Sequence, residues 1–233
     1  MPSLLHLDAS ARVDRSISRD LSANFVEVWK KHRPQDIIIR RDVGVNSPGF
    51  VSQDWIDACF TPEAARTDAQ TKALAESDIL IAELEQADLI VLGTPMYNYG
   101  PPAALKAWVD QVVRVNKTFS FDLARGDYPL EPIMTGKTLV CLTSKGEFGF
   151  APGGMRERMS HLDPHIEVFA HYLDVNETHF IDVEYQEFGG DRHHRSRAEA
   201  NRKAIALADT LARDFGHLPA IDTFVPNASV FAN

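Results

Sequence analysis

The sequence predicts a single α/β domain in which a parallel β-sheet carries helices on both faces. Apolar segments alternate five times with longer segments of helical periodicity. The apolar segments are nearly continuous hydrophobic runs, which is typical of strands buried on both faces. The chain has 233 residues, 44% of them apolar, and is therefore long enough to bury one sizeable core. Such alternation implies a parallel sheet, because a right-handed crossover returns each strand in the same direction.

The first two strands flank the first expected helix. Residues 3–9 form a short, mostly apolar segment that is expected to be the first strand. A helix is expected over residues 16–32, because apolar residues recur at helical spacing from Leu21 onward. Residues 36–41 (DIIIRR) are expected to form the second strand. Residues 46–62 contain proline, glycine and scattered aromatic residues, and we expect an irregular surface excursion there.

The middle of the chain repeats the alternation. A helix over residues 67–86 is expected to lead into the third strand, residues 87–94. The next helix, residues 101–116, begins with prolines at positions where a missing N–H is harmless. Residues 117–136 are rich in aromatic residues and glycine and are expected to be irregular. The fourth strand is expected at residues 137–143 (KTLVCLT).

The last third supplies one more strand between two helices. A glycine-rich stretch follows the fourth strand and extends through Gly154. We expect a short helix at residues 166–172 and the fifth strand at residues 178–184. The final helix is expected over residues 196–215, where Gly216 ends it.

Five such strands favour the order 2-1-3-4-5, the flavodoxin-like arrangement. In sheets of this type a ligand binds outside the carboxyl ends of the strands, where the strand order reverses. The loops after the first, third and fourth strands are therefore the candidate site.

Composition excludes several classes of function. The net charge of −9 argues against nucleic acid as a partner, and we interpret the basic cluster at residues 192–197 as a solvated helix start. Cys59 and Cys141 match no metal-ligand spacing and fit a reducing cytosol. The N-terminus lacks a signal-peptide pattern, and no apolar run approaches the roughly 20 residues of a membrane span. We expect a cytoplasmic protein without a membrane partner.

No metal site is expected either. His161, Asp163 and His165 lie close in the sequence, but Pro164 stands among them and the sequence implies no further ligand. We interpret these residues as part of a loop or helix start. The sequence also contains no Gly-x-Ser-x-Gly motif, so a hydrolase of that kind has little support.

The loop after the first strand predicts a phosphate site. Ser10, Ser16 and Ser18 supply hydroxyl groups, and the chain enters a helix around Ile17. Free N–H groups in the first turn of a helix, together with its dipole, attract anions. The alternative is that Ser16 is an ordinary N-cap. The loop matches neither the glycine-rich dinucleotide fingerprint nor a P-loop.

The other two loops favour a planar ligand. The loop after the third strand offers flat, half-polar side chains and backbone N–H groups at Met96, Tyr97, Asn98 and Tyr99. Its alternative interpretation is a tight turn with aromatic plugs. The loop after the fourth strand could hold the other edge of the same ring through Ser144, Lys145, Gly146 and Glu147, although alone it predicts only a turn. A phosphate site beside two such loops is the layout of a flavin mononucleotide site.

The same segments carry a resemblance to a known family. The chain resembles the FMN-dependent NADH:azoreductases and quinone reductases, which have a flavodoxin-like fold. The resemblance spans most of residues 3–183. It depends on four segments: DASARVDRSISRDLSANFVEVW, PMYNYGPPAALKAWVDQVVR, the pair Thr118-Phe119, and TGKTLVCLTSKG.

The resemblance implies one non-covalent FMN per subunit of a homodimer, close to the subunit interface. It implies that NADH or NADPH donates a hydride and that a quinone or azo compound accepts the electrons in a ping-pong cycle. The flavin performs this chemistry, so no side chain is named as catalytic. Carried over by position, the phosphate ligands are Ser10, Ser16, Ile17 and Ser18. The ring contacts are Met96, Tyr97, Asn98, Tyr99, Ser144, Lys145, Gly146 and Glu147, with Phe119 and Tyr99 as substrate-stacking residues.

The chain departs from the family pattern at two places. The fourth-strand loop commonly has Ser-Arg-Gly-Gly in the family, whereas this chain has Ser-Lys-Gly-Glu. Glu147 is unexpected near a flavin, and we expect its carboxylate either to face solvent or to shift the flavin potential. If the position required a positive φ, glutamate would also be strained there. Residues 218–233 are additional, so we expect a domain over residues 1–217 and a C-terminal extension.

Two other functions remain open. A flavodoxin-type carrier would bind FMN without turning over a small molecule, and a flavin-free module would bind only a phosphorylated ligand. The loops at residues 46–62 and 117–136 favour a walled substrate pocket and hence a reductase.

Overall fold

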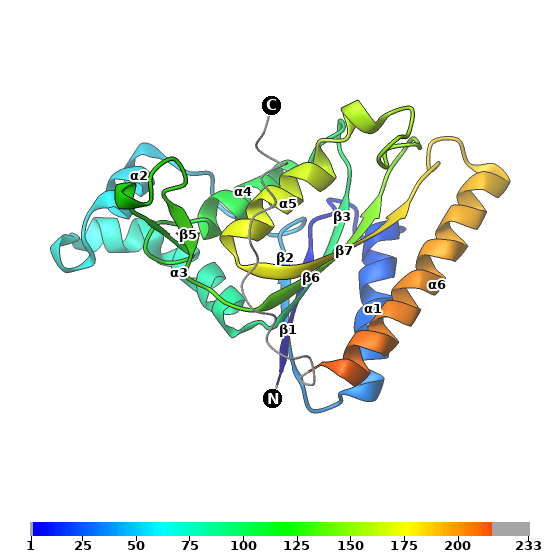
Figure 1. Cartoon of the computed structure of the whole chain (residues 1–233), viewed down its shortest axis with the longest axis horizontal. Coiled ribbons are helices and arrows are strands. Elements are labelled where there is room, and N and C mark those ends of the chain that lie inside the picture. The colour runs from blue at the N-terminus through cyan, green and yellow to red at the C-terminus, as the bar shows by residue number, and fades with distance from the viewer. Residues whose placement is uncertain (1, 216–233) are drawn as a thin grey trace.

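The structure is a computed structural model that describes residues 2–215. Its main sheet has five parallel strands in the order β2-β1-β3-β6-β7 (Figure 1). These strands are β1 (Ser3–Asp8), β2 (Ile37–Asp42), β3 (Leu89–Pro95), β6 (Lys137–Ser144) and β7 (Val175–Val183). Because β6 and β7 are the fourth and fifth strands of this sheet, the expected order 2-1-3-4-5 and the flavodoxin-like fold class are confirmed.

Helices cover both faces of the sheet (Figure 1). One face carries α1 (Ile17–His32) and α6 (Gly190–Asp214), which pack against each other. The other face carries α3 (Asp68–Gln86), α4 (Ala103–Val112) and α5 (Leu162–Tyr172). The sheet therefore separates two hydrophobic clusters, one under each helical layer.

Strand β3 shows why the sequence contains continuous apolar runs. All seven of its residues are buried. Leu89 and Val91 join the cluster beneath α1 and α6, whereas Ile90 and Leu92 join the cluster on the other face. Successive side chains of a strand point to opposite faces, so burial of both faces leaves no polar alternation.

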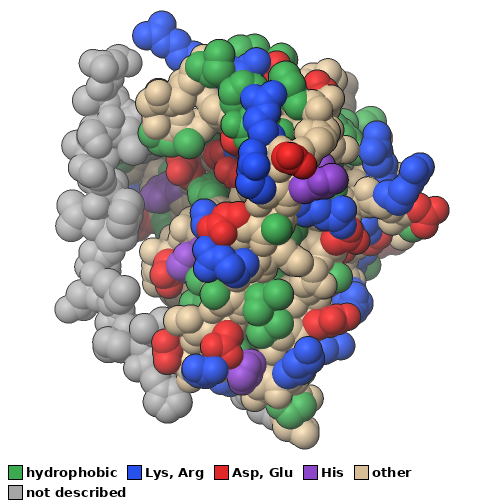
Figure 2. Space-filling view, turned by 90° about the vertical axis from the view of Figure 1, so that its right-hand side faces the viewer, with side chains coloured by type: hydrophobic (Ala, Val, Ile, Leu, Met, Phe, Trp, Pro, Cys, Tyr) green, Lys and Arg blue, Asp and Glu red, His purple; other side chains and the backbone are tan. Residues whose placement is uncertain are grey.

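Helix α6 approaches the sheet through small side chains. Ala200, Ala204, Ala208 and Ala212 recur every four residues and are all buried. This spacing places them on one face of the helix. The outer face carries ion pairs between neighbouring turns, and Figure 2 shows basic and acidic side chains interspersed on this side of the molecule.

Residues 46–62 contain a helix that the sequence analysis did not predict, α2 (Gln53–Phe60). Its N-cap is Ser52, whose hydroxyl accepts a hydrogen bond from the backbone N–H of Trp55. The Trp55 indole donates to the Gln111 side chain of α4 at 2.8 Å. Only two residues of this eight-residue helix are buried, too few to give a recognisable period.

Residues 117–136 also contain regular structure. The strands β4 (Phe119–Phe121) and β5 (Leu130–Pro132) pair in an antiparallel hairpin outside the main sheet. Each has three residues, which is too short to show alternation in the sequence.

Several element boundaries differ from expectation. Helix α5 begins at Leu162 rather than 166, and α6 begins at Gly190 rather than 196. In α5 the polar or helix-breaking residues Asp163, Pro164 and His165 follow Leu162, and in α6 a polar run follows Gly190, so the helical period is hidden in both. Helix α4 ends at Val112, before the expected 116. The expected extension at residues 218–233 lies outside the described residues.

Candidate functional site

The loops after β1, β3 and β6 meet at one edge of the sheet, as expected. Asp8 at the end of β1 pairs with Gly93 of β3, and Pro95 of β3 pairs with Ser144 of β6. Beyond the strands, the backbone N–H of Met96 donates to the Ser144 carbonyl at 2.9 Å. The sheet register therefore brings the three candidate loops together.

The serines of the first loop line a buried cradle at the start of α1. Ser10, Ser16 and Ser18 are at most 5% exposed, and the hydroxyls of Ser16 and Ser18 lie 3.5 Å apart. Ser16 stands at the N-cap of α1, but its side chain makes no capping hydrogen bond. The ordinary N-cap interaction is therefore absent. The first-turn N–H groups and the hydroxyls can serve an anion instead.

Arg19 fixes the shape of this cradle. Its guanidinium donates to the Ser10 carbonyl at 2.6 Å and to the Arg12 carbonyl at 2.8 Å. It also binds both carboxylate oxygens of Asp42, at 2.6 and 2.7 Å. Burial raises the pKa of Asp42, but the hydrogen bonds and charge of Arg19 together with the backbone N–H groups of Val45 and Gly44 outweigh it, and the net shift is downward. Arg19 thus joins the loops after β1 and β2.

Two glycines allow close approaches beneath the cradle. A Cβ atom on Gly44 would lie 2.1 Å from the Ser10 carbonyl oxygen. A Cβ atom on Gly93 would lie 2.5 Å from the Asp8 carboxylate and 2.8 Å from the Ser22 hydroxyl. The loop after β2 therefore contacts the cradle through Gly44, and α1 contacts β3 through Gly93. No pattern in the sequence predicts either contact.

The loop after β3 makes a two-residue turn. Tyr97 and Gly100 exchange backbone hydrogen bonds, each 3.0 Å long. Between them, Asn98 has φ 47° and Tyr99 has φ 67°. Positive φ at both central residues is typical of a type I′ turn. Asparagine tolerates a positive φ, whereas tyrosine rarely adopts one. The turn is tight, yet Tyr97 and Tyr99 each remain 38% exposed.

An open groove of about 720 Å³ lies beside this turn. Its walls come from the turn and from the first residues of α4 and α5: Tyr97, Asn98, Gly100, Pro101, Ala103, Lys106, His161 and His165. Of the predicted site residues, only Tyr97 and Asn98 line it. Burial and the neighbouring Lys106 lower the pKa of His165, so its imidazole is less basic than usual.

Lys145 of the third loop is buried and does not line the groove. Its side chain is 1% exposed, and its ammonium lies 2.6 Å from Asp163 of α5 and 3.0 Å from Asp182 of β7. Burial lowers the pKa of Lys145, but the two carboxylates raise it overall. The backbone N–H of Lys145 donates to the Val183 carbonyl at 2.7 Å, so neither its side chain nor its N–H is free at the sheet edge.

Glu147 contacts the turn. Its carboxylate accepts a hydrogen bond from the Tyr99 hydroxyl at 3.0 Å and lies 3.1 Å from the Arg156 guanidinium. Asn98 and Tyr99 have positive φ, whereas Glu147 does not. The carboxylate is therefore neither free in solvent nor held in a strained backbone.

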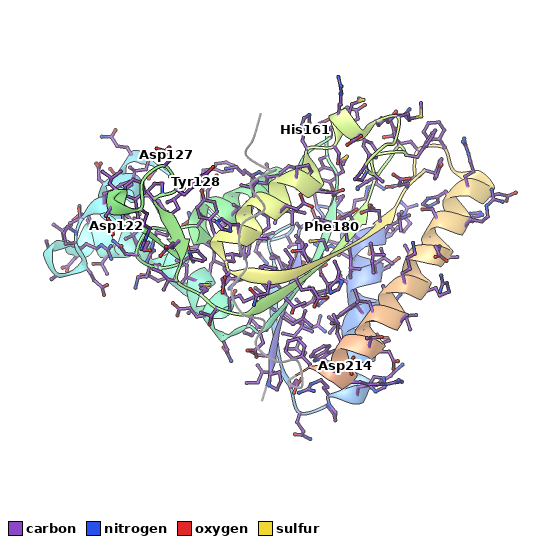
Figure 3. The ribbon with its side chains drawn as sticks, in the orientation of Figure 1. Asp122, Asp127, Tyr128, His161, Phe180 and Asp214 are labelled. Carbon is purple, nitrogen blue, oxygen red and sulfur yellow. The ribbon has the colours of Figure 1, made fainter. Side chains whose placement is uncertain are left out.

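Phe119 lies apart from these residues within the subunit. Its ring packs edge-on against Tyr172, the last residue of α5, with centroids 5.2 Å apart. The turn meets the opposite end of α5, where the N–H of His161 donates to the Tyr99 carbonyl. Eleven helical residues span about 16 Å. Figure 3 shows His161 at the start of α5, with Asp122 and Tyr128 of the hairpin region toward its other end.

No metal site was found among residues 2–215, where no group of three or more potential ligands is suitably arranged. His161, Asp163 and His165 instead form the start of α5, as interpreted from the sequence. Cys141 is buried in the core, and burial raises the pKa of its thiol. The search of the same residues for a helix long and apolar enough to cross a membrane was also negative.

A doubly wound sheet with a serine cradle after β1 and an exposed aromatic turn after β3 is typical of α/β proteins that bind a ligand at the carboxyl ends of their strands. Comparison with known proteins narrows this class. A family model described as having the flavodoxin-like fold matches residues 2–207.

The chain is 54% identical over 219 residues to FMN-dependent NADH:quinone oxidoreductase 2 of Idiomarina loihiensis, covering 91% of each chain. It is 53% identical to the protein of the same name from Colwellia psychrerythraea, covering 91% of this chain and 100% of that one. The crystal structure of azoreductase from Bacillus anthracis shares the fold, with a TM-score of 0.80 at 20% identity over 90% of this chain and all of the other. The chain belongs to the family of FMN-dependent NADH:quinone oxidoreductases and is an oxidoreductase enzyme.

Proposed function

We propose that the chain is an FMN-dependent NAD(P)H:quinone oxidoreductase that also cleaves aromatic azo compounds reductively. The structural observation that carries this proposal is the buried serine cradle at the uncapped start of α1, at the same sheet edge as the turn of Tyr97 and Tyr99, since β1 and β3 are neighbouring parallel strands. The names of the relatives at 54% and 53% identity support the same activity.

The residues fit a flavin mononucleotide. Ser10, Ser16, Ser18 and the N–H groups around Ile17 would hold the phosphate, because Ser16 makes no capping hydrogen bond to the first turn of α1. Two backbone segments would flank the ring, residues 96–99 and residues 144–147. When bound, the flavin supplies the hydride transfer.

The chain's own residues would bind the cofactor and orient the substrates. Arg19 keeps the cradle in shape, and the turn offers its backbone groups and the face of Tyr99 to a flat molecule. NADH or NADPH and the acceptor would use the same place in turn, in a ping-pong cycle. The acceptor would be a quinone or an azo compound.

Phe119 would contribute from a second subunit. Within its own subunit it packs at the far end of α5 from Tyr99, so it reaches a substrate only if another copy supplies it. We therefore include a homodimer in the proposal. The proposal also includes a cytoplasmic location without a nucleic-acid or membrane partner. It further includes a domain over residues 1–217 with an extension at 218–233. The charge of −9 supports the absence of nucleic acid.

The absorbance spectrum of the purified protein tests the proposal. We expect flavin bands that bleach on anaerobic addition of NADH and return on addition of benzoquinone. A protein that neither contains nor binds FMN would refute the interpretation of all three loops. A long-lived one-electron-reduced form that benzoquinone does not reoxidise would instead favour the electron carrier.

A further inference from the structure

The contact between Tyr99 and Glu147 belongs to a series of interactions that connects the loop after β3 with the loop after β6. The Tyr99 hydroxyl donates to one oxygen of the Glu147 carboxylate at 3.0 Å. The other oxygen lies 3.1 Å from Arg156. Arg156 in turn donates to the Phe148 carbonyl at 3.1 Å and stacks over the Phe148 ring at 4.7 Å. We call Tyr99, Glu147 and Arg156 the clasp.

The clasp joins segments that no regular element connects. Tyr99 lies in the loop after β3, whereas Glu147 and Arg156 lie before and after the glycine-rich stretch that follows β6. The backbone of Tyr99 is held independently, because its carbonyl accepts from the N–H of His161. Glu147 therefore controls where the ring points rather than where the main chain runs.

The ring needs such a support. Tyr99 is 38% exposed, and its aromatic neighbour is the buried Phe150, at a centroid distance of 6.3 Å. A ring with so much exposed surface would sample other rotamers without a bond to its hydroxyl. The Glu147 side chain is 24% exposed, and Arg156 holds its carboxylate in place. The carboxylate can therefore accept a hydrogen bond from the Tyr99 hydroxyl in a fixed position.

We propose that Glu147 is a positioning residue, which holds the Tyr99 ring as a fixed wall of the site where the electron acceptor stacks. This inference rests on the proposed function, since it assigns the turn to the acceptor site. It also accounts for a carboxylate at a position where the resemblance led us to expect glycine. The effect of Glu147 is exerted through Tyr99 and not through its charge.

The first test uses the protein without flavin, so that it does not depend on the proposed activity. Tyrosine labelled with ¹³C at Cζ reports the titration of each phenol by NMR, and the Y99F variant identifies the Tyr99 signal. The hydrogen bond to Glu147 raises the pKa of Tyr99. We expect this pKa to fall in E147G, and to fall less in E147Q, whose amide oxygen still accepts a hydrogen bond. An unchanged pKa in E147G would refute the contact.

The second test measures benzoquinone kinetics. Freeing one rotamer-rich side chain weakens binding by about three- to tenfold, so E147G should raise KM by about this factor with little change in kcat. E147Q should restore most of the affinity. Y99F should resemble E147G, and E147G should have no additional effect in the Y99F background.

A matched control separates positioning from charge. Glu187 lies on the neighbouring loop and also acts electrostatically on Tyr99, but its carboxylate does not bond to the Tyr99 hydroxyl. We expect E187Q to leave KM unchanged. An equal rise in KM for E187Q and E147Q, or an undiminished effect of E147G in the Y99F background, would overturn the proposal. If the wild-type protein does not bind flavin, the proposed function is refuted. The titration of the Tyr99 phenol would still test the contact between Tyr99 and Glu147.

Discussion

Replacing Gly44 by alanine tests whether the shape of the serine cradle depends on the loop after β2. The new Cβ atom would lie 2.1 Å from the Ser10 carbonyl oxygen and 2.5 Å from the Ser10 carbonyl carbon. Cβ contacts in real proteins are essentially never shorter than 3.0 Å, so the shortfall is 3.0 − 2.1 = 0.9 Å. The neighbour is backbone, which cannot rotate away, and the loop carrying Ser10 must therefore move by about that distance.

This displacement should affect both stability and cofactor binding. Overpacking of this kind typically costs about 1–3 kcal/mol of folding free energy. Loss of one or two hydrogen bonds to a charged phosphate costs about 1.5–3 kcal/mol, so the Kd for FMN should rise by roughly ten- to a hundredfold.

The assay is quenching of flavin fluorescence on titration of the apoprotein, with urea unfolding of the same sample. Gly49→Ala is a matched control on the same segment, because its Cβ would meet only the flexible Glu76 carboxylate, at 3.3 Å. We expect the control to bind FMN like the wild-type protein. Wild-type FMN affinity in Gly44→Ala would refute the assignment of the cradle as the phosphate site, provided that urea unfolding shows the expected loss of stability.

Three further predictions follow from single contacts. Ser16→Ala should weaken FMN binding by about tenfold and leave stability nearly unchanged, because Ser16 makes no capping bond; a stability loss without an affinity loss would restore the ordinary N-cap interpretation. Asp42→Asn should destabilise the apoprotein by about 1 kcal/mol at neutral pH after allowance for solvent screening. The pKa of Asp42 is lowered on folding, so its contribution is present above the unfolded pKa of 3.8 and lost as the pH falls through the lower folded value; urea unfolding should show a smaller difference between variant and wild type at pH 3 than at pH 7. Trp55→Phe removes the 2.8 Å hydrogen bond to Gln111 and should cost about 1–3 kcal/mol in urea unfolding without changing the FMN Kd, whereas a changed Kd would connect α2 to the site.

The main sheet could be predicted because its central strands, β1, β3 and β6, are buried on both faces. In β3, for example, the consecutive residues 89–92 are all apolar, and their side chains alternate between the two hydrophobic clusters. Few structures other than a strand buried on both faces need such a continuous apolar run. The hairpin of β4 and β5 could not be predicted, because each strand has three residues and no period can be measured over so short a length. Helix α2 was missed for a related reason, since only Trp55 and Ala58 are buried.

Part of the candidate site could likewise be predicted from the sequence, and part of it could not. The serines and the tyrosine turn follow strands directly, so strand order alone places them at one edge. The clasp depends on the path of the glycine-rich stretch between Glu147 and Arg156, which has no periodic pattern to reveal it. Arg19 looks like any surface arginine in the sequence, and only the structure shows that it binds the Ser10 carbonyl and Asp42.

The buried ammonium of Lys145 determines how the sheet edge opens. It joins the end of β6, the start of α5 through Asp163, and β7 through Asp182. Any local opening that separates α5 from β7 must therefore leave at least one buried charge without its partner. Amides at these three places should exchange with solvent as one cooperative unit, at rates close to those of global unfolding. The ends of β6 and β7 and the start of α5 thus share the kinetic protection of the core, and we expect motions that admit a substrate to occur in the loops beyond them.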